Sequence, residues 1–318
     1  MRAFLVVVAA LYLAGCQVPS APGPLGSNGP ATGVRAGLKT PVVIAVDATD
    51  ERLVYWPMNA RGSSSPAYLS GGLHLYATAM AANGNVVTIA SYKPPELLSY
   101  DVTTRKKSII VDPYGAPVDV AIGKTATLYA LDEKNVGVFP PGSSSYKLSC
   151  RYIHIGSAIA VDNEGDVFVD GYGPGNSSGV VEYAAGSSTC VKLKLKKQSG
   201  YRVGLGVDPK TDDLIVEDWV GCAGGSEGRI TVYARPYGPK VVARNYLHGN
   251  CLGGFRLDAT STNLLVLDGY SGARGDREVK ACGLRWIDQR SYPQTKGRSM
   301  YTNGCAAAVT TIPNTLPN

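Results

Sequence analysis

Residues 157–170 read SAIAVD-NEG-DVFVD, and the architecture can be worked out from this stretch. An apolar segment ending in Val-Asp precedes a three-residue polar turn, and a second apolar segment follows the turn. Short Val- and Ile-rich runs on either side of an Asn/Gly turn are typical of a β-hairpin. The stretch therefore predicts two neighbouring antiparallel strands.

The same pattern recurs along the chain. Clear copies lie at 205–218 and 255–268, and weaker copies at 77–90 and 118–132. Aligned at equivalent positions, the copies are separated by steps of 42, 39, 46 and 50 residues, counted between Ala81, Gly123, Asp162, Asp208 and Asp258. A period of this length, built from short strands, is that of a β-propeller blade.

Each unit continues with two more predicted strands. The third strand is represented by 136–139, 180–183, 230–233 and 284–287. A turn rich in Pro, Gly and Ser follows, and then an outer strand such as 192–196, in which Lys alternates with Val and Leu. Four antiparallel strands per unit make one blade.

The two ends of the repeat region predict how the ring closes. Residues 42–47, 52–58 and 66–70 match the second, third and fourth strands of a unit that lacks its inner strand. Residues 305–311 (CAAAVTT) form an apolar strand without partners after it. We expect an all-β, six-bladed β-propeller of four-stranded antiparallel blades, closed by this C-terminal strand, with seven blades as the alternative.

The segments IAVD (159–162), GDVFVD (165–170) and VVEY (180–183) resemble the NHL-type repeats of six-bladed propellers. The resemblance covers nearly all of the chain from residue 41 onward, and exported bacterial proteins of unknown function are the most similar members. It implies a fold more than an activity, because the scaffold serves lyases, lactonases, sensors and interaction platforms.

The N-terminus predicts export and lipid attachment. Arg2 precedes an apolar run at 3–12 that is too short to span a bilayer, and Leu-Ala-Gly-Cys follows at 13–16. This resembles the lipobox of bacterial lipoproteins, in which a peptidase cuts before the cysteine and the thiol carries the lipid, here Cys16. The alternative is an ordinary secretory signal that ends near a cysteine. Gln17 favours the outer membrane over the inner membrane by the same resemblance.

The expected organisation is a signal peptide at 1–15, the lipidated cysteine and a tether at 16–40, and the propeller domain at 41–318. The tether is rich in Pro, Gly, Ser and Ala and lacks aromatic residues, so it cannot order itself by burial. A flexible chain of this length spans about 25–30 Å on average. The domain is therefore expected to stand away from the membrane.

The cysteine count agrees with an oxidising compartment. Of seven cysteines, Cys16 is reserved for the lipid, and the other six are an even set without zinc-site spacing. Cys222 and Cys251 occupy the same two places in one unit as Cys282 and Cys305 in the next. We therefore expect the pairs Cys222–Cys251 and Cys282–Cys305, and by elimination Cys150–Cys190.

The only three histidines are His74, His154 and His248, on connections entering inner strands in units two, four and six. Three imidazoles near one axis would suit a catalytic zinc or another divalent metal, and some NHL-type lyases bind metal this way. In those enzymes the histidine stands immediately before the inner strand, and the matching residues here are Tyr76, Ser157 and Gly253. The register therefore favours three scattered surface histidines and no cofactor.

Two groups of acids also invite a site. A carboxylate follows the second strand in five of six units, and a ring of acids could bind a cation or a basic ligand: Asp47, Asp132, Asp170, Asp218 and Asp268. Recurrence in nearly every unit favours a structural role, with each acid accepting N–H groups of the following turn. The run DNEGD at 162–166 lacks the length and distal Glu of an EF-hand, so a hairpin turn explains it better.

Composition argues against nucleic acid as a partner. The net charge is +6, and the densest basic stretch, with Lys at 192, 194, 196 and 197, is expected on an outer strand, where lysines protect a sheet edge. We predict a monomeric, membrane-anchored module that binds an envelope protein or glycan through blade connections rich in Tyr, Gly and Trp219. The competing hypothesis is a metal-dependent lyase or hydrolase that uses the histidines.

Overall fold

The computed structural model describes the backbone of residues 41–47, 51–58, 67–70, 73, 76–176, 178–196, 201–220, 227–248, 251–257, 263–269, 283–288, 298–301 and 306–312. From residue 201 onward, side chains are described at 204–218, 228–244, 254–257, 264, 265, 267 and 308–311. Within these residues no helix is both long and apolar enough to cross a membrane.

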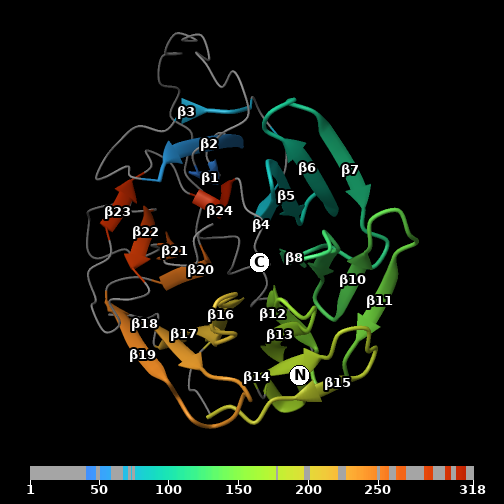
Figure 1. Ribbon diagram of the computed structural model, residues 1–318, viewed down its shortest axis with the longest axis vertical. Coiled ribbons are helices and arrows are strands. Elements are labelled where there is room, and N and C mark those ends of the chain that lie inside the picture. Colours follow the sequence, from blue (N-terminus) through green and yellow to red (C-terminus); the bar gives the residue numbers. More distant parts are fainter. Residues whose placement is uncertain are drawn as a thin grey trace.

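The described strands form six four-stranded antiparallel sheets, which surround a common centre in Figure 1. The innermost strands are β4 (Ala77–Asn83), β8 (Asp119–Ile122), β12 (Ile155–Val161), β16 (Tyr201–Val207), β20 (Cys251–Leu257) and β24 (Ala306–Ile312). The second strands are β5 (Val86–Ser91), β9 (Leu128–Leu131), β13 (Val167–Tyr172), β17 (Leu214–Val220), β21 (Asn263–Gly269) and β1 (Val42–Asp47).

The third strands are β6 (Glu96–Asp101), β10 (Asn135–Phe139), β14 (Ser178–Tyr183), β18 (Glu227–Tyr233), β22 (Gly283–Asp288) and β2 (Arg52–Pro57). The outer strands are β7 (Lys107–Val111), β11 (Tyr146–Ser149), β15 (Cys190–Lys192), β19 (Ala243–His248), β23 (Arg298–Tyr301) and β3 (Ala67–Tyr68). A short 3-10 turn, η2 (Pro174–Asn176), follows β13.

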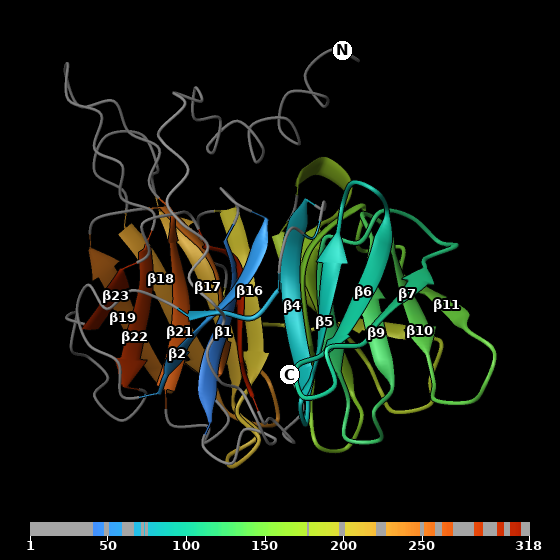
Figure 2. The same cartoon turned by 90° about the horizontal axis from the view of Figure 1, so that it is seen from above.

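Neighbouring sheets pack through their apolar faces. Each innermost strand contacts the innermost strand of the next sheet, and these contacts include β24 with both β4 and β20. Seen at right angles in Figure 2, β4 and β16 run roughly along the central axis. Large side chains such as Trp56, Phe168 and Phe255 are fully buried between sheets. Because each sheet has apolar residues on both faces, it is stable only between two neighbours.

The predicted β-propeller of four-stranded antiparallel sheets is confirmed. The sheet that contains β1 has the order β24-β1-β2-β3, with Val42 opposite Ile312 and Val43 opposite Thr311. This is the pairing that the sequence analysis expected for the C-terminal apolar strand. It brings the first and last described strands of the chain into one sheet.

Inner strand β12 begins two residues earlier than the Ser157 start that the sequence predicted. A register shift between Gly156 and Ala158 lets the strand continue back to Ile155. Gly171 on the partner strand permits this, since a Cβ there would lie 2.3 Å from the Ile155 carbonyl oxygen. The apolar alternation breaks at a β-bulge, so it gave the wrong start.

Other predicted boundaries were also wrong. β13 runs on to Tyr172 and β17 to Val220, so Asp170, Asp218 and Trp219 lie within strands and Trp219 is not in a connection. The outer strand predicted at 192–196 is β15, Cys190–Lys192. Leu193 and Leu195 are partly buried against the next sheet, which explains why their alternation with Lys imitated a longer strand.

Candidate functional site

The strand order gives the molecule two faces that hold different sets of loops. The turn face holds the turns between first and second strands and between third and fourth strands. The connection face holds the turns between second and third strands and the links from each outer strand to the next inner strand. In propellers and barrels, residues on such loops are free to vary without disturbing the sheets, so sites are expected there.

On the connection face, two sheets present their side chains in the same way. Tyr76 stands immediately before β4, and its backbone exchanges hydrogen bonds with Lys93 (3.1 Å) and Tyr92 (3.0 Å). His154 stands immediately before β12, and its N–H donates to the Tyr172 carbonyl oxygen at 2.7 Å. The Tyr76 side chain is 58% exposed, and His154 is also exposed.

The link from β11 to β12 adds a cation and an aromatic ring to this face. The Arg151 guanidinium lies 4.9 Å from the centre of the Tyr152 ring and donates to its hydroxyl at 2.7 Å. Ile155, the first residue of β12, is 38% exposed. Tyr and Arg are enriched at protein interfaces, and here Tyr76 stands immediately before β4 while Arg151 and Tyr152 lie on the link that enters β12.

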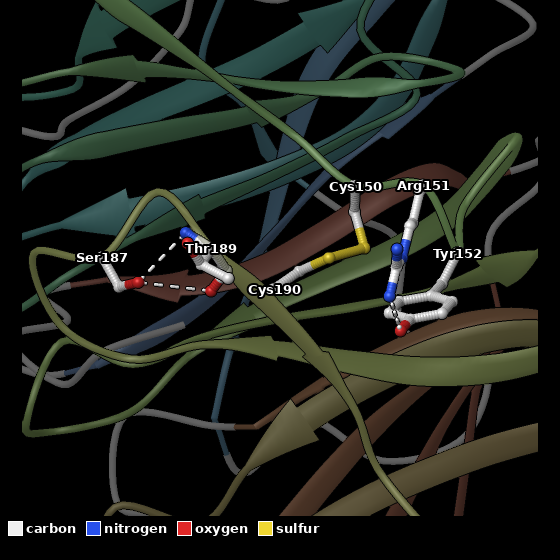
Figure 3. The surroundings of a disulfide bond; sticks show 6 residues. All are labelled: Cys150, Arg151, Tyr152, Ser187, Thr189 and Cys190. Carbon is white, nitrogen blue, oxygen red and sulfur yellow. Dashed lines mark hydrogen bonds between the residues drawn. A yellow bond between two sulfur atoms is a disulfide. The ribbon is translucent and has the colours of Figure 1, made fainter.

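A disulfide holds this link in place. Cys150 and Cys190 are bonded, with their Cα atoms 5.8 Å apart, and Figure 3 shows the Arg151–Tyr152 pair beside Cys150. On the other side, the Ser187 hydroxyl accepts from the Thr189 N–H at 3.0 Å and fixes the approach to Cys190. The bond joins the end of β11 to the start of β15, and it is the pair that elimination predicted.

The centre of the ring contains an ion pair that the sequence analysis did not anticipate. Arg256 of β20 reaches across to β8, where its Nη2 atom contacts Oδ1 of Asp119 and donates to the Val120 carbonyl oxygen at 3.1 Å. Its Nε donates to the Met80 carbonyl oxygen of β4, also at 3.1 Å. Oδ2 of Asp119 accepts from the Ile159 N–H of β12 at 2.8 Å. One buried pair thus connects four sheets.

On the turn face, one arginine lies among four carboxylates. Nη2 of Arg235, after β18, is 2.9 Å from Glu164 and 2.8 Å from Asp166, while Nη1 is 3.6 Å from Asp162 and 4.0 Å from Asp212. We call these five residues the acidic turn. Asp162, Glu164 and Asp166 come from the β12–β13 turn, so the guanidinium joins two neighbouring sheets.

Burial perturbs the acids and the phenol around the acidic turn. Desolvation raises the pKa of the Asp162 carboxyl, and the neighbouring Asp166 carboxylate raises it further against the backbone N–H groups that lower it. Burial likewise raises the pKa of Glu182, with Asp166 again contributing. Burial also raises the pKa of the Tyr237 hydroxyl, whose ring lies next to Arg235. Burial is therefore the main cause of the raised pKa values of these groups, and neighbouring carboxylates add to it.

The acids predicted to accept N–H groups of turns do so only in part. Oδ1 of Asp132 accepts from Lys134 (2.7 Å) and Asn135 (2.6 Å), as expected. Oδ1 of Asp170 also accepts a backbone N–H, that of the next residue Gly171 at 2.8 Å, but both residues lie within β13 and not in a turn, and Asp218 of β17 pairs with Arg229 at 3.3 Å. Asp47 ends β1, and the side chain of Asp268 lies outside the described residues.

The predicted histidine site and two predicted disulfides stay predictions. His74 and the side chain of His248 lie outside the described residues, although the backbone of His248 ends outer strand β19 and is not in the connection where it was expected, so His154 alone of the three has a described side chain. Because β12 begins at Ile155, the residue that stands before it is His154 and not Ser157 as expected; Tyr76 holds the matching place before β4. Cys16, Cys222, Cys282, Cys305 and the Cys251 side chain also lie outside the described residues.

The arginines that organise the axis and the acidic turn carried no signal in the sequence. Arg235 and Asp166 are 69 positions apart, and Arg256 and Asp119 are 137 apart. The DNEGD run itself was visible, but nothing in the chain marked its partner. An isolated arginine near a strand is common, and only the packing of different sheets against one another brings these two arginines to their acids.

Known proteins resemble this chain in fold but not in sequence. No family model and no curated protein matches it. A solved structure of a nidogen/laminin complex contains a chain that superposes with a TM-score of 0.65 at 12% identity, covering 85% of this chain and 98% of that one. TolB from Acinetobacter baumannii gives 0.62 at 10% identity, covering 85% of this chain and 66% of its own. Kuenenia stuttgartiensis hydrazine synthase gives 0.52 at 13% identity, covering 75% and 70%. The chain is thus similar to these proteins as a β-propeller.

Proposed function

We propose that this chain is a cell-envelope lipoprotein whose β-propeller binds a protein or glycan partner through its connection face. The observation that carries the proposal is the exposure of Tyr76, Arg151, His154 and Ile155 at the ends of two inner strands. Aromatic rings and guanidinium groups supply most of the binding energy in protein interfaces. The Arg256–Asp119 pair joins β4, β8, β12 and β20, which include the two inner strands that carry these residues.

The ring in this proposal has six blades and is closed by β24. Its support is the set of six four-stranded sheets, together with the antiparallel pairing of β24 and β1. A closed ring leaves no sheet face without a neighbour. The NHL-type resemblance of the repeats, carried by residues 159–183, agrees with this count.

The anchor in this proposal is a lipid on Cys16, after removal of residues 1–15, with residues 16–40 as the tether. These residues lie outside the described part, and the support is the Leu-Ala-Gly-Cys motif at 13–16. The Cys150–Cys190 disulfide supports an oxidising compartment outside the cytoplasm. A Cys16→Ala variant would leave the membrane fraction, and a palmitate analogue would label only the wild-type chain.

A partner protein is the occupant that the fold neighbours favour. A chain with a similar fold was solved as part of a nidogen/laminin complex, which favours another protein as the occupant. Catalysis is left unassigned in this proposal. The single feature that favours the metal-dependent lyase or hydrolase is the place of His154 immediately before β12, and Tyr76 occupies the same place before β4.

Photocrosslinking in cells tests the interaction surface. A photoreactive phenylalanine replaces Tyr76 on the connection face, and the matched control replaces exposed Lys106 on the turn face. We expect a discrete adduct from position 76 only, with protease digestion separating a protein partner from a glycan. Equal adducts from both positions, or none from position 76, would contradict the proposed surface.

The enzyme hypothesis has its own test. Metal analysis of natively purified protein would show about one zinc per chain, lost in His154→Ala, if histidines formed a catalytic site. A metal-free protein that still gives the position-76 adduct would leave the interaction module as the function.

A further inference from the structure

The acidic turn contains more negative charge than its arginine can neutralise. One guanidinium faces the carboxylates of Asp162, Glu164, Asp166 and Asp212 at 2.8–4.0 Å. One oxygen from each of Asp162, Glu164 and Asp166 lies within 4.8 Å of the others. Like charges held this closely repel one another unless further positive charge binds between them.

Only one of the two carboxylate oxygens of Asp162 takes part in the hydrogen bonds that form the turn. Its Oδ1 atom accepts the N–H groups of Glu164, Gly165 and Asp166 at 2.8–2.9 Å, and Gly165 supplies the left-handed conformation (φ +92°) that this tight turn needs. Its Oδ2 atom is buried and accepts no hydrogen bond. That oxygen is directed toward the Arg235 guanidinium, 3.6 Å away.

The two carboxylate oxygens of Asp166 also have different partners. Its Oδ1 accepts the Ala185 N–H at 2.7 Å, which fixes the side chain, and its Oδ2 faces Arg235 at 2.8 Å. The Glu164 carboxylate completes the group from the solvent side and is 63% exposed. Two rigidly held carboxylate oxygens and one movable carboxylate therefore converge on the position of the guanidinium.

We propose that the acidic turn is a calcium site, in which Ca²⁺ exchanges with the guanidinium of Arg235. Oxygen ligands from carboxylates suit hard cations, and Ca²⁺ accepts irregular shells completed by water, which exposed Glu164 admits. The Arg235 side chain is 32% exposed, so it can move out toward solvent when the cation enters. Cation binding then loosens the link between the β12–β15 and β16–β19 sheets and strengthens the turn itself.

The exchange predicts that removing the arginine strengthens cation binding. Arg235→Gln removes the competing charge, and full-length protein should bind Ca²⁺ at least about tenfold more tightly than wild type, measured by calorimetry. Arg235→Lys keeps a positive charge and should bind no more tightly than wild type. In the Arg235→Gln background, Glu164→Gln should weaken binding by about tenfold, whereas Glu133→Gln, an exposed acid on the connection face, should change nothing.

Terbium luminescence locates the bound ion. The Tyr237 ring centre lies 5.9 Å from the Arg235 guanidinium, so a Tb³⁺ ion at that position would be sensitised by Tyr237. Tyr237→Phe in the Arg235→Gln background should lower the luminescence while Ca²⁺ displaces Tb³⁺ at the same concentration. Unchanged luminescence in that variant would place the ion elsewhere and overturn the proposal.

Two further results would overturn it. One is an Arg235→Gln protein, folded by circular dichroism, that binds neither ion saturably; the other is an equal loss of affinity from Glu164→Gln and Glu133→Gln. If Arg235→Gln does not fold, wild type and Glu164→Gln are compared directly. Ca²⁺ must then raise the Tm of wild type more than that of Glu164→Gln, and equal shifts would refute the site.

Discussion

Two arginines in this molecule join sheets, and they do so in opposite electrostatic circumstances. Arg256 at the axis meets one carboxylate and three carbonyl oxygens, and its side chain is 11% exposed. Arg235 at the turn face meets four carboxylates and is 32% exposed. The first pair is balanced and buried, so it can only hold the ring together. The second arginine faces more negative charge than it can neutralise and is accessible to water, so Ca²⁺ can replace its guanidinium.

The largest expected effect is at the axis. Arg256→Met leaves the Asp119 carboxylate buried without its cation and should lower the free energy of unfolding by about 3–5 kcal/mol in urea titrations. Lys106→Met on an exposed turn serves as the control and should change stability little. Combining Arg256→Met with Asp119→Asn should recover part of the loss, because the orphaned charge is gone. A loss near that of the control would contradict a structural role for the pair.

The stabilisation by the Cys150–Cys190 disulfide can be compared with that by the Arg256–Asp119 ion pair. Asp119 accepts the Ile159 N–H, so it joins the same two sheets that Cys150–Cys190 joins. Replacing both cysteines by serine should cost about 2–4 kcal/mol, since the bond closes a long loop in the unfolded chain. A thiol reductant should destabilise wild type by at least this amount and should destabilise the double serine variant by correspondingly less, because only the wild type has this bond to lose. A reductant-insensitive wild type would mean that the sheets are held by the axis alone.

A smaller effect is expected at the acidic turn. Arg235→Gln in calcium-free buffer should cost about 1–2 kcal/mol, since partly exposed charge-assisted hydrogen bonds are lost. Glu164→Gln alone should change stability by less than about 0.5 kcal/mol, because Glu164 is mostly exposed. In the Arg235→Gln background the same change should become stabilising, since it relieves repulsion. A destabilising effect there would show that the acids do not repel one another.

The smallest expected effect on stability is that of replacing Asp112. This residue is a buried acid for which no ion pair is found among the described residues. Burial raises its folded-state pKa, with the nearby Asp132 carboxylate contributing. The folded protein therefore holds this proton more tightly than the unfolded chain, and stability falls as pH rises from the unfolded to the folded pKa. Asp112→Asn should flatten that part of the stability–pH curve in unfolding titrations. A curve that keeps its wild-type slope would assign the dependence to other groups.

The sequence predicted those parts of the molecule that depend on local pattern. The pattern indicated strands at 42–47 and 52–58, which are β1 (42–47) and β2 (52–57), and the apolar C-terminal run is the strand that pairs with β1. The start of β12 was wrong because a bulge at Gly156 breaks the alternation. The length of β15 was wrong because Leu193 and Leu195 pack beyond the strand. In both places packing between sheets overrides the periodicity within one.

The candidate sites were less predictable for a topological reason. The DNEGD run could be assigned to a hairpin turn, and the structure agrees, since Asp162 accepts three backbone N–H groups there. Arg235 arrives from the neighbouring sheet, so no spacing within the run reveals it. Tyr76 and His154 were recognised as residues near inner strands, yet their exposure depends on how the connections pass over the sheet ends. To predict such contacts between sheets from the sequence, one must first know how the sheets are placed relative to one another.

The pairing of β24 with β1 also affects how the chain folds during its synthesis. β1 is among the first segments of the domain to be synthesised, and its inner partner is among the last. Until that partner emerges, one edge of β1 is a row of unpaired backbone groups, open to other strands. Pairing between strands so far apart in the sequence is slow to form, so this edge stays open to aggregation for longer than the edges inside the other sheets.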